Sequence, residues 1–273
     1  MPEGHTIHRL AQDHAERFMG RKTQVTSPQG KFSDAAALLT GQKMTGTEAH
    51  GKHLFLQFGA SWIHIHLGLF GKYTLGETPA PPPTDTVRLR LRSDTHYSDL
   101  RGPTTCALIT DPEKQAIHDR LGPDPLRPDS DPARAYARIN RSRTTIAALL
   151  MDQKVIAGVG NVYRAEVLFR HGIDPYTPGK DLTQAQLTAI WDDLVMLMRD
   201  GVRANRIDTV RPEHAPEAMN RPPRVDDHGG EVYVYRRAPH PCHLCGTEIR
   251  RAELAARNLF WCPSCQPACQ NPC

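Results

Sequence analysis

Four cysteines near the C-terminus have the spacing of a metal site. They form two pairs, Cys242-His-Leu-Cys245 and Cys262-Pro-Ser-Cys265, separated by sixteen residues. Two Cys-x-x-Cys pairs at such a distance are typical of a tetrahedral zinc site, and four protein thiolates leave no coordination position open for a catalytic water. We therefore predict one structural Zn²⁺ held by all four cysteines. A redox-active pair is the alternative, and the lack of a surrounding βαβ pattern disfavours it.

A second set of chemical groups lies at the start of the chain. Once Met1 is removed, Pro2 presents a secondary amine, which can attack an electrophilic carbon and collapse to a cationic iminium. An α-amino group has a pKa of about 7.7–8.0, so a useful fraction is neutral near pH 7. Glu3, the next residue, is a candidate general acid or base. The alternative is that Pro2 only begins a helix.

Two further positions have the residue types of a phosphate or sugar contact. Lys52 follows Gly51 at the start of an apolar strand pattern, where its ammonium could meet an anionic oxygen. Asn161 ends the run Gly158-Val-Gly160-Asn161 before a helical pattern, and helix N-termini preceded by glycines favour anions. The alternatives are a solvated lysine at a strand end and an asparagine that merely caps the helix. His64 and His66 alternate with apolar residues, and we interpret them as the polar face of a strand without a metal.

Length and composition indicate a water-soluble chain of about two domains. It has 273 residues, 39% hydrophobic and 23% charged, which is ordinary globular composition. No run approaches a membrane span, and the polar N-terminus is unlike a signal peptide, so we expect a cytoplasmic protein. Lys plus Arg exceed Asp plus Glu by 34 − 30 = 4, a mild basicity that permits a polyanionic partner.

The hydrophobic pattern predicts an N-terminal helix and β-sandwich followed by a helical domain with a β-hairpin zinc finger, an α+β multidomain fold. Helical spacing over residues 5–19 gives way to period two between about residues 22 and 110. In the strand 87–92, alternate arginines predict an exposed cationic face. Four prolines in residues 122–132 indicate a linker. Helical patterns then cover 133–140, 144–152, 161–171 and 183–202.

These patterns give the following domain boundaries. Residues 1–121 form the β-sandwich domain, 122–132 the linker, 133–235 the helical domain, 236–268 the zinc finger and 269–273 a tail that contains Cys269 and Cys273. Residues 246–261, between the two cysteine pairs, alternate as a two-stranded hairpin would. Five arginines against two glutamates in the zinc-finger region make the hairpin cationic, so that its loop could enter a nucleic-acid groove or remain a solvated basic turn.

Taken together, four motifs resemble one family. They are Pro2-Glu3-Gly4, Gly51-Lys52-His53-Leu54, Gly158-Val-Gly160-Asn161 and Arg257-Asn-Leu-Phe-Trp-Cys262. Along nearly its whole length the sequence resembles the formamidopyrimidine-DNA glycosylase and endonuclease VIII family of bifunctional base-excision repair enzymes, most closely the actinobacterial endonuclease VIII branch. The resemblance implies a helix-two-turn-helix in the second domain and double-stranded DNA carrying oxidised bases or abasic sites as partner. It also implies action on the bacterial nucleoid, and we expect a monomer.

The resemblance assigns roles residue by residue. The N-terminal proline of the family attacks C1′ of the damaged nucleotide, the adjacent glutamate handles protons and a hairpin lysine assists; Pro2, Glu3 and Lys52 match these positions. Asn161 matches a phosphate clamp, and Arg257 matches a zinc-finger arginine that holds phosphates beside the lesion. The turn Gly68-Leu69-Phe70-Gly71 matches the loop that fills the hole left by an everted base.

Leu69 and Phe70 are apolar wedges of the kind that unstack base steps, and a hairpin contact in the core is the alternative reading. The sequence also departs from the family. Many members continue Pro-Glu-Gly-Pro-Glu or Pro-Glu-Leu-Pro-Glu, whereas His5 and Thr6 follow Gly4 here, so a second acidic residue is missing. Purine-directed members typically begin Pro-Glu-Leu-Pro-Glu, so the resemblance places Gly4 in the pyrimidine-directed branch. It thereby implies excision of oxidised pyrimidines followed by β,δ-elimination. The competing hypotheses are an oxidised-purine glycosylase and a non-catalytic zinc-hairpin protein that binds damaged DNA.

Overall fold

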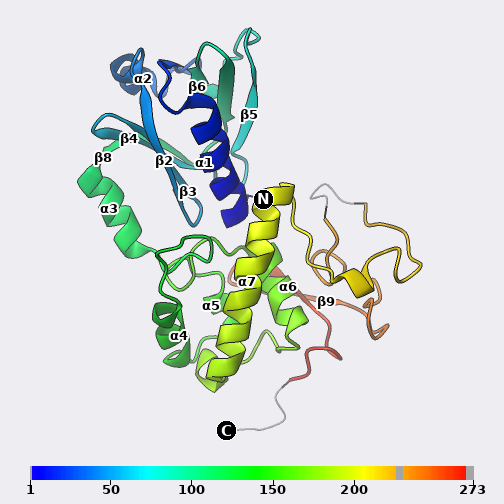
Figure 1. Cartoon of the computed structure of the whole chain (residues 1–273). Coiled ribbons are helices and arrows are strands. Elements are labelled where there is room, and N and C mark those ends of the chain that lie inside the picture. Colours follow the sequence, from blue (N-terminus) through cyan, green and yellow to red (C-terminus); the bar gives the residue numbers. More distant parts are fainter. Residues whose placement is uncertain (1, 226–229, 269–273) are drawn as a thin grey trace. The chain divides into compact units, whose positions relative to one another are not determined.

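The computed structural model describes residues 2–225 and 230–268. The chain divides into two compact units, Met1–Arg120 and Leu121–Cys273, which Figure 1 colours from blue to green and from green to red. The first unit contains an N-terminal helix and two β-sheets, and the second is mainly helical and ends in a β-hairpin with four cysteines. The predicted fold class is confirmed.

The first unit is built from two four-stranded antiparallel sheets and three helices. The sheets have the strand orders β1-β6-β7-β5 and β2-β3-β4-β8. The strands are β1 (Gln24–Thr26), β2 (Met44–His50), β3 (His53–Phe58), β4 (Ser61–His66), β5 (Lys72–Glu77), β6 (Val87–Arg92), β7 (His96–Arg101) and β8 (Thr105–Thr110). The helices are α1 (Gly4–Phe18), α2 (Ser33–Leu39) and α3 (Asp111–Arg120).

One hydrophobic core lies between the two sheets. Alternate residues of β3, such as Leu54 and Leu56, enter it together with Leu89 and Leu91 of β6. The apolar stripe of α1 covers the same core, since its residues at helical spacing are buried: Ile7, Leu10, Ala11, His14 and Phe18. The predicted helix over residues 5–19 is therefore confirmed, displaced by one residue.

The prediction of an exposed cationic face on β6 is wrong for its central arginine. Arg90 is only 7% exposed. Its Nε and Nη2 donate to the two carboxylate oxygens of Asp99 on the neighbouring strand β7 at 2.6 and 2.9 Å, and Nη1 donates to the carbonyl of Pro81. A planar guanidinium satisfies a carboxylate in this bidentate way, so that it can be buried. Of the three arginines of β6, only Arg92 is exposed.

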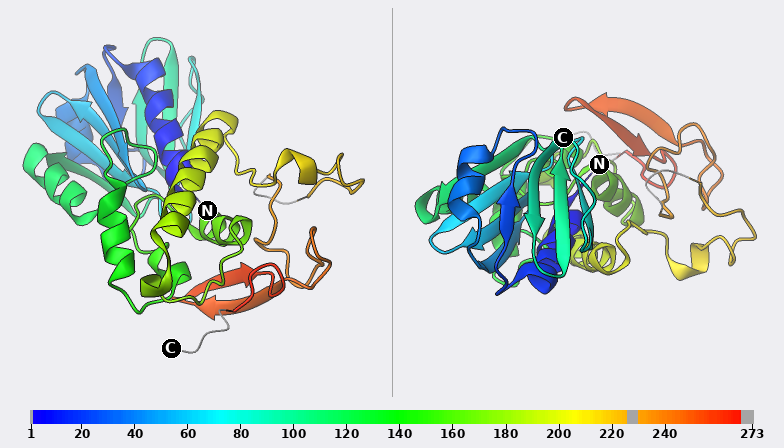
Figure 2. Two further views of the ribbon diagram at one scale, coloured as in Figure 1. Left: turned by 60° about the horizontal axis from the view of Figure 1, so that its bottom comes forward. Right: turned by 90° about the horizontal axis from the view of Figure 1, so that it is seen from above.

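Within residues 121–225 and 230–268, the second unit contains four α-helices, two short 3₁₀ turns and one β-hairpin. They are α4 (Pro132–Asn140), α5 (Ile146–Leu149), α6 (Asn161–Arg170), η1 (Gly179–Asp181), α7 (Gln184–Ala204), η2 (Pro212–His214), β9 (Arg250–Leu254) and β10 (Arg257–Trp261). Thr183 and Gln186 form a capping box at the start of α7. Figure 2 shows β9 and β10 in orange to red as the predicted two-stranded hairpin.

The helix predicted over residues 144–152 is a single turn, Ile146–Leu149. Asp152 accounts for its early end, because the Asp152 carbonyl accepts from Val155 N at 2.8 Å and its carboxylate accepts from Lys154 N at 2.9 Å. Such local bonds from aspartate compete with helix continuation. Sequence analysis did not predict helices α2 and α3. In α3 only Ile117 is buried, so the helix has no apolar periodicity.

Residues 121–125, where the linker was expected to begin, are buried in the second unit. Gly122 N donates to the carbonyl of Gln153 at 2.9 Å, and Ala157 N donates to the carbonyl of Pro123 at 3.0 Å. The proline-rich segment is thus hydrogen-bonded to the loop that precedes α6. In the part of the chain that the structure describes, no helix is both long enough and apolar enough to cross a membrane.

Candidate active site and zinc centre

The start of α1 holds the two N-terminal candidates. Glu3 is the N-cap residue in an extended conformation, and its carbonyl accepts a hydrogen bond from Thr6 N at 3.0 Å. The Glu3 side chain is fully buried, where the N-terminus of the helix favours a negative charge. Pro2 is half-buried and immediately precedes it, whereas Met1 lies outside the described residues. Pro2, the candidate nucleophile, and Glu3, the candidate acid–base group, are therefore both positioned at the N-terminus of α1.

Lys52 lies in the two-residue turn between β2 and β3. The strands pair up to His50 and His53, so that only Gly51 and Lys52 form the connection. Gly51 has φ +58°, and a glycine at positive φ in the first central position is what a type II′ hairpin turn needs. The lysine predicted at a strand start is thus presented at the tip of a tight hairpin.

The packing of α1 brings Pro2 and Glu3 to the same end of the unit as Lys52. Met19, directly after α1, forms a bridge with Met44 at the start of β2, and α1 packs along β2 and β3. The helix has fifteen residues and spans about 22 Å. The seven residues of β2 span about 23 Å. The start of α1 therefore lies beside the end of β2, as Figure 1 shows.

The turn between β4 and β5 presents the predicted wedge residues to solvent. Leu69 is 46% exposed and Phe70 is 85% exposed, so neither is a core contact. Gly71 N donates to the carbonyl of Leu67 at 3.0 Å, and a Cβ on Gly71 would lie 2.3 Å from that oxygen. The tightness of the turn holds both large apolar side chains outside the unit.

In the second unit, Asn161 joins α6 to the zinc hairpin. Gly160 is the N-cap, and Asn161 is the first helical residue, so the capping role considered for the asparagine is absent. Its Nδ2 donates to the carbonyl of Asn258 at 2.9 Å, and its Oδ1 accepts from the buried Arg164. Arg164 also donates to the Asn258 carbonyl at 3.1 Å. Asn161 is thus buried and held by the hairpin backbone and by Arg164.

The loop before α6 is organised by Gln153, which sequence analysis did not single out. Its side-chain nitrogen donates to the carbonyls of Met151 and Val159, and its oxygen accepts from Gly158 N at 3.0 Å. Gly158 has φ +90°, a conformation that L side chains rarely adopt. Together with the N-cap Gly160 it shapes the entry to α6.

Arg257 begins β10, directly after the hairpin turn. Leu254 pairs with Arg257, so that Ala255 and Ala256 form a two-residue turn. Both alanines have positive φ, 52° and 56°, which is the geometry of a type I′ turn. Arg257 is partly exposed beside this turn, and Arg250 and Arg251 on β9 are exposed.

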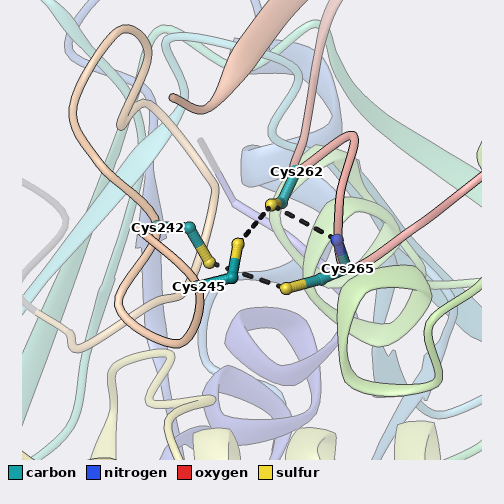
Figure 3. A group of neighbouring side chains, drawn as sticks. All are labelled: Cys242, Cys245, Cys262 and Cys265. Carbon is teal, nitrogen blue, oxygen red and sulfur yellow. Dashed lines mark hydrogen bonds between the residues drawn. The ribbon is translucent and has the colours of Figure 1, made fainter. Parts of the chain in front are cut away.

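The four predicted zinc ligands converge, as Figure 3 shows. Their sulfur atoms all lie within 4.8 Å of one another, with 3.8 Å between Cys242 and Cys265 and 3.4 Å between Cys245 and Cys262. Zn–S bonds of about 2.3 Å in a tetrahedron require sulfurs about 3.8 Å apart, so the cluster fits one structural zinc. Leu244 N and Cys265 N point at sulfurs of Cys242 and Cys262, which stabilises thiolates.

Glu166 is a functional candidate that sequence analysis missed. This fully buried glutamate of α6 accepts hydrogen bonds from the backbone nitrogens of Tyr233, Val234 and Tyr235 at 2.6–2.9 Å. It also accepts from Thr209 Oγ1 at 2.6 Å. One carboxylate therefore anchors two segments between α7 and the zinc hairpin to the helix that carries Asn161. Only the tertiary structure reveals this anchor, because no local pattern marks it.

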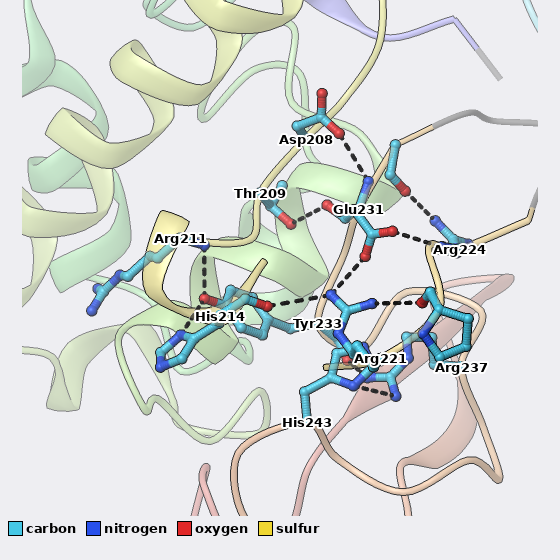
Figure 4. Close-up of polar contacts among 12 residues, drawn as sticks. Asp208, Thr209, Arg211, His214, Arg221, Arg224, Glu231, Tyr233, Arg237 and His243 are labelled. Atoms are coloured by element: carbon cyan, nitrogen blue, oxygen red, sulfur yellow. Dashed lines mark hydrogen bonds and ion pairs between the residues drawn. The ribbon is translucent and has the colours of Figure 1, made fainter. Parts of the chain in front are cut away.

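A polar network stabilises the same region (Figure 4). The Glu231 carboxylate accepts from Arg221 Nη2 at 2.7 Å and from Arg224 N at 2.6 Å. Burial alone would raise the pKa of Glu231, but these hydrogen bonds hold it below the ordinary value. The Tyr233 hydroxyl accepts from Arg211 N at 2.9 Å and lies 2.8 Å from His214 Nδ1.

Three family models match successive parts of the chain. The Formamidopyrimidine-DNA glycosylase N-terminal domain matches residues 1–106, the Formamidopyrimidine-DNA glycosylase H2TH domain residues 121–211, and the zinc finger found in FPG and IleRS residues 240–268. The last match covers all four cysteines.

Individual proteins are similar over almost their whole length. Endonuclease 8 1 of Mycobacterium tuberculosis is 50% identical, covering 97% of this chain and 100% of the relative. A formamidopyrimidine-DNA glycosylase of Chloroflexus aggregans is 31% identical over 97% and 98% of the two chains. A solved Lactococcus lactis Fpg in complex with DNA containing N7-benzyl-Fapy-dG has a TM-score of 0.77 at 23% identity, covering 98% of this chain and 100% of that chain. From the 50% identity across both chains and the three matched domains, we conclude that this protein belongs to the formamidopyrimidine-DNA glycosylase and endonuclease VIII family.

Proposed function

We propose that this protein is a bifunctional DNA glycosylase and abasic-site lyase that excises oxidised pyrimidines and cleaves the strand through a Schiff base on Pro2. One observation carries the chemistry. The buried carboxylate of Glu3 directly follows Pro2 at the start of α1, and α1 packs so that this end lies beside the Lys52 turn. A secondary amine, an acid–base group and a cation are the groups that amine-catalysed elimination from a sugar requires.

In the proposed reaction, the neutral Pro2 nitrogen attacks C1′ of the damaged nucleotide and the C1′–base bond breaks, with proton transfer assisted by Glu3. The C1′–O4′ bond of the sugar ring then breaks, O4′ takes a proton, and the iminium so formed makes the C2′ proton acidic. Its removal breaks the C3′–O bond, and a second elimination breaks the C5′–O bond, which leaves phosphate on both sides of the gap. Water then releases Pro2. In this scheme Lys52 contributes a positive charge beside the sugar and phosphate oxygens.

The second unit holds the DNA in this proposal. Asn161 at the start of α6 and Arg257 at the hairpin turn bind phosphates, and the zinc keeps the hairpin folded without entering a chemical step. Leu69 and Phe70 supply the exposed apolar surface that enters the base stack when the lesion is everted. Solved relatives include an Lactococcus lactis Fpg in complex with DNA that contains an abasic site, with a TM-score of 0.77 at 22% identity.

The preference for pyrimidines rests on Gly4 and on relatedness. The 50% identity to endonuclease 8 1, against 31% to formamidopyrimidine-DNA glycosylases, supports the endonuclease VIII branch. A bacterial enzyme of this kind acts on the nucleoid. The chain lacks the second acidic residue that many family members carry, since His5 and Thr6 occupy that region. In the proposed reaction the acid–base work near the amine therefore falls to Glu3.

Borohydride trapping on a panel of duplexes tests the proposal. Protein whose N-terminal Pro2 is verified by mass spectrometry should become covalently attached to DNA with oxidised pyrimidines or abasic sites, and less with oxidised purines. The matched control is the same chain with an N-terminal extension, which keeps every side chain and blocks the amine. Binding without trapping on any lesion would support the non-catalytic alternative, and trapping mainly on oxidised purines would support the purine glycosylase.

A further inference from the structure

Histidines cluster on the outer face of the sheet β2-β3-β4-β8. Cross-strand partners share a face, and the register pairs His50 with His53, His53 with His66 and Phe55 with His64. All five side chains therefore lie on the face opposite to Leu54 and Leu56, which enter the core. The polar face that was predicted for this strand is not solvated, because helix α3 packs on it and His64 is only 8% exposed.

Hydrogen bonds connect these imidazoles in pairs. His53 Nδ1 lies 2.8 Å from His64 Nε2 on the neighbouring strand, and His50 Nδ1 lies 3.0 Å from His118 Nδ1 on α3. The Phe55 ring lies between His64 and His118, with centroid distances of 5.1 and 5.2 Å. The last residue of β2 before the Gly51–Lys52 turn, His50, is thus bonded to α3, and the first residue of β3 after the turn, His53, is bonded to β4.

His53, His64 and His66 remain neutral near pH 7. A hydrogen bond between two imidazole nitrogens needs one nitrogen without a proton as acceptor. Burial, with neighbouring histidines and Arg120, lowers the pKa of His53 to about 3 and that of His64 to about 4. Burial, and next the charge of Lys52, lowers the pKa of His66. These three histidines therefore add no positive charge beside the lysine.

A metal site does not explain the cluster. Within residues 2–225 and 230–268, the four cysteines are the only group of three or more His, Cys, Asp or Glu side chains placed to hold a metal ion. Glu48 on β2 forms an ion pair with Lys114 of α3 through Oε2, and its Oε1 lies 3.6 Å from Nε2 of His118. The hydrogen bonds of His50 and His53 instead hold the two ends of the Gly51–Lys52 turn.

We propose that the bonded pairs His53–His64 and His50–His118 position the Lys52 ammonium for the reaction, with His53 as the main positioning residue. This inference rests on the proposed function, because it acts through Lys52. The two pairs fix both ends of a two-residue turn to β4 and to α3, which leaves the turn little freedom. A misplacement of about 1 Å of a catalytic group can cost on the order of 10²-fold in rate.

Two substitutions of His53 separate the hydrogen bond from the packing. His53→Asn keeps a donor or acceptor near the position of Nδ1, whereas His53→Phe keeps an aromatic ring and removes the bond. Single-turnover cleavage of a pre-formed abasic site should fall about tenfold or more in His53→Phe and be largely restored in His53→Asn, with the DNA dissociation constant unchanged. The matched control is His96→Phe on β7 of the other sheet, which should keep the rate of the unaltered protein.

A double-mutant cycle with Lys52→Ala decides whether His53 acts through the lysine. If it does, adding His53→Phe to Lys52→Ala causes no further loss of rate. A multiplicative loss would overturn the inference and leave the role of Lys52 standing. A full rate in Lys52→Ala alone would remove Lys52 from the proposed mechanism and this inference with it, while trapping would still report on Pro2. Should His53→Phe not fold, as seen by circular dichroism, His118→Phe replaces it in the same cycle.

Discussion

Asn161 at the start of α6 donates its side-chain amide to the backbone carbonyl of Asn258 in β10 over 2.9 Å. The bond crosses 97 residues of sequence and joins the helix-two-turn-helix to the zinc hairpin. Asn161 is itself a proposed phosphate contact, and Asn258 directly follows Arg257, the other one. One side chain therefore sets the separation between the two proposed phosphate contacts of the second unit.

Replacing Asn161 with aspartate should break this connection. The substitution replaces the Nδ2 donor with a carboxylate oxygen that faces the carbonyl of Asn258. The loss of a buried hydrogen bond in this way lowers the free energy of unfolding by about 1–3 kcal/mol. We expect a lower melting temperature and a weaker affinity for abasic-site DNA, measured by calorimetry and fluorescence anisotropy. Asn205→Asp, at the exposed C-cap of α7, is the control. Wild-type affinity in Asn161→Asp would rule out a role for this bond in DNA binding.

Removing one zinc ligand should affect the second unit selectively. Cys262→Ser leaves three thiolates, so the zinc content measured by mass spectrometry should fall and the hairpin that carries Arg257 should lose its order. DNA affinity should fall strongly, while the β-sheet signal of the first unit remains. Cys106→Ser on β8, which lies outside the cluster, should keep both zinc and affinity. DNA binding undiminished in a metal-free Cys262→Ser protein would contradict a structural zinc.

The amino-acid sequence predicts the structural features that depend on residues close together in the chain. The spacing of Cys242, Cys245, Cys262 and Cys265 predicts that the four sulfurs converge, because two Cys-x-x-Cys pairs at this distance are typical of a zinc site. The apolar stripe of residues 5–19 predicts α1, because the period of a helix can be recognised from neighbouring residues alone.

Features that depend on distant partners escaped sequence reasoning. The burial of Arg90 depends on Asp99 across a strand pair, and the Glu166 anchor depends on backbone nitrogens about seventy residues away. The histidine cluster depends on the cover that α3 provides, which no apolar periodicity revealed. The roles of Pro2, Glu3, Lys52, Asn161 and Arg257 remain predictions.

The salt dependence of binding should report on Arg257. Each phosphate neutralised contributes a slope of about 0.9 in log K against log salt concentration. Arg257→Ala should therefore weaken binding across sequences and reduce the slope by about one. Arg17→Ala, at an ion pair with Asp13 at the end of α1, should leave the slope as it is. Equal slopes for Arg257→Ala and the unaltered protein would remove this arginine from the phosphate contacts.

Acid should destabilise the first unit through buried neutral histidines. His14 lies 2.7 Å from the Leu10 carbonyl through Nδ1, which must therefore donate, and 3.3 Å from Ser98 Oγ through Nε2. Burial lowers its pKa to about 4, against an ordinary value of 6.5. The unfolded chain thus binds more protons between these values, so stability is full above pH 6.5 and falls as the pH drops toward 4.

The expected loss from His14 at pH 5 is about 2 kcal/mol. His5, whose pKa burial and nearby positive charge lower to about 4, acts in the same direction. Urea unfolding at pH 7.5 and pH 5 should show the loss, and His14→Gln should reduce the difference because an amide does not titrate. A pH dependence that is identical in His14→Gln would show that His14 is protonated in the folded state.

Glu3→Gln should separate base excision from strand cleavage. Departure of a base from an intact nucleotide requires proton transfer at the sugar or at the base, and general acid–base catalysis of this kind contributes about 10²–10⁴-fold. A pre-formed abasic site already exposes an aldehyde, so Pro2 can condense with it without that assistance. The amide keeps the size of the buried side chain and removes its titratable proton, so excision of oxidised pyrimidines should be lost while cleavage and trapping at abasic sites remain measurable.

Pro2→Gly is the matched variant, because it exchanges the secondary amine for a primary one and keeps Glu3. It should slow both reactions, since both pass through the same nitrogen, and it should still form a trappable imine. The two rates are measured on one duplex series, with the lesion replaced by an abasic site at the same position. A parallel decrease of both rates in Glu3→Gln would show that the carboxylate supports the fold or a step common to both reactions. The assignment of the nucleophile to Pro2 and of proton transfer to Glu3 would then have to be given up.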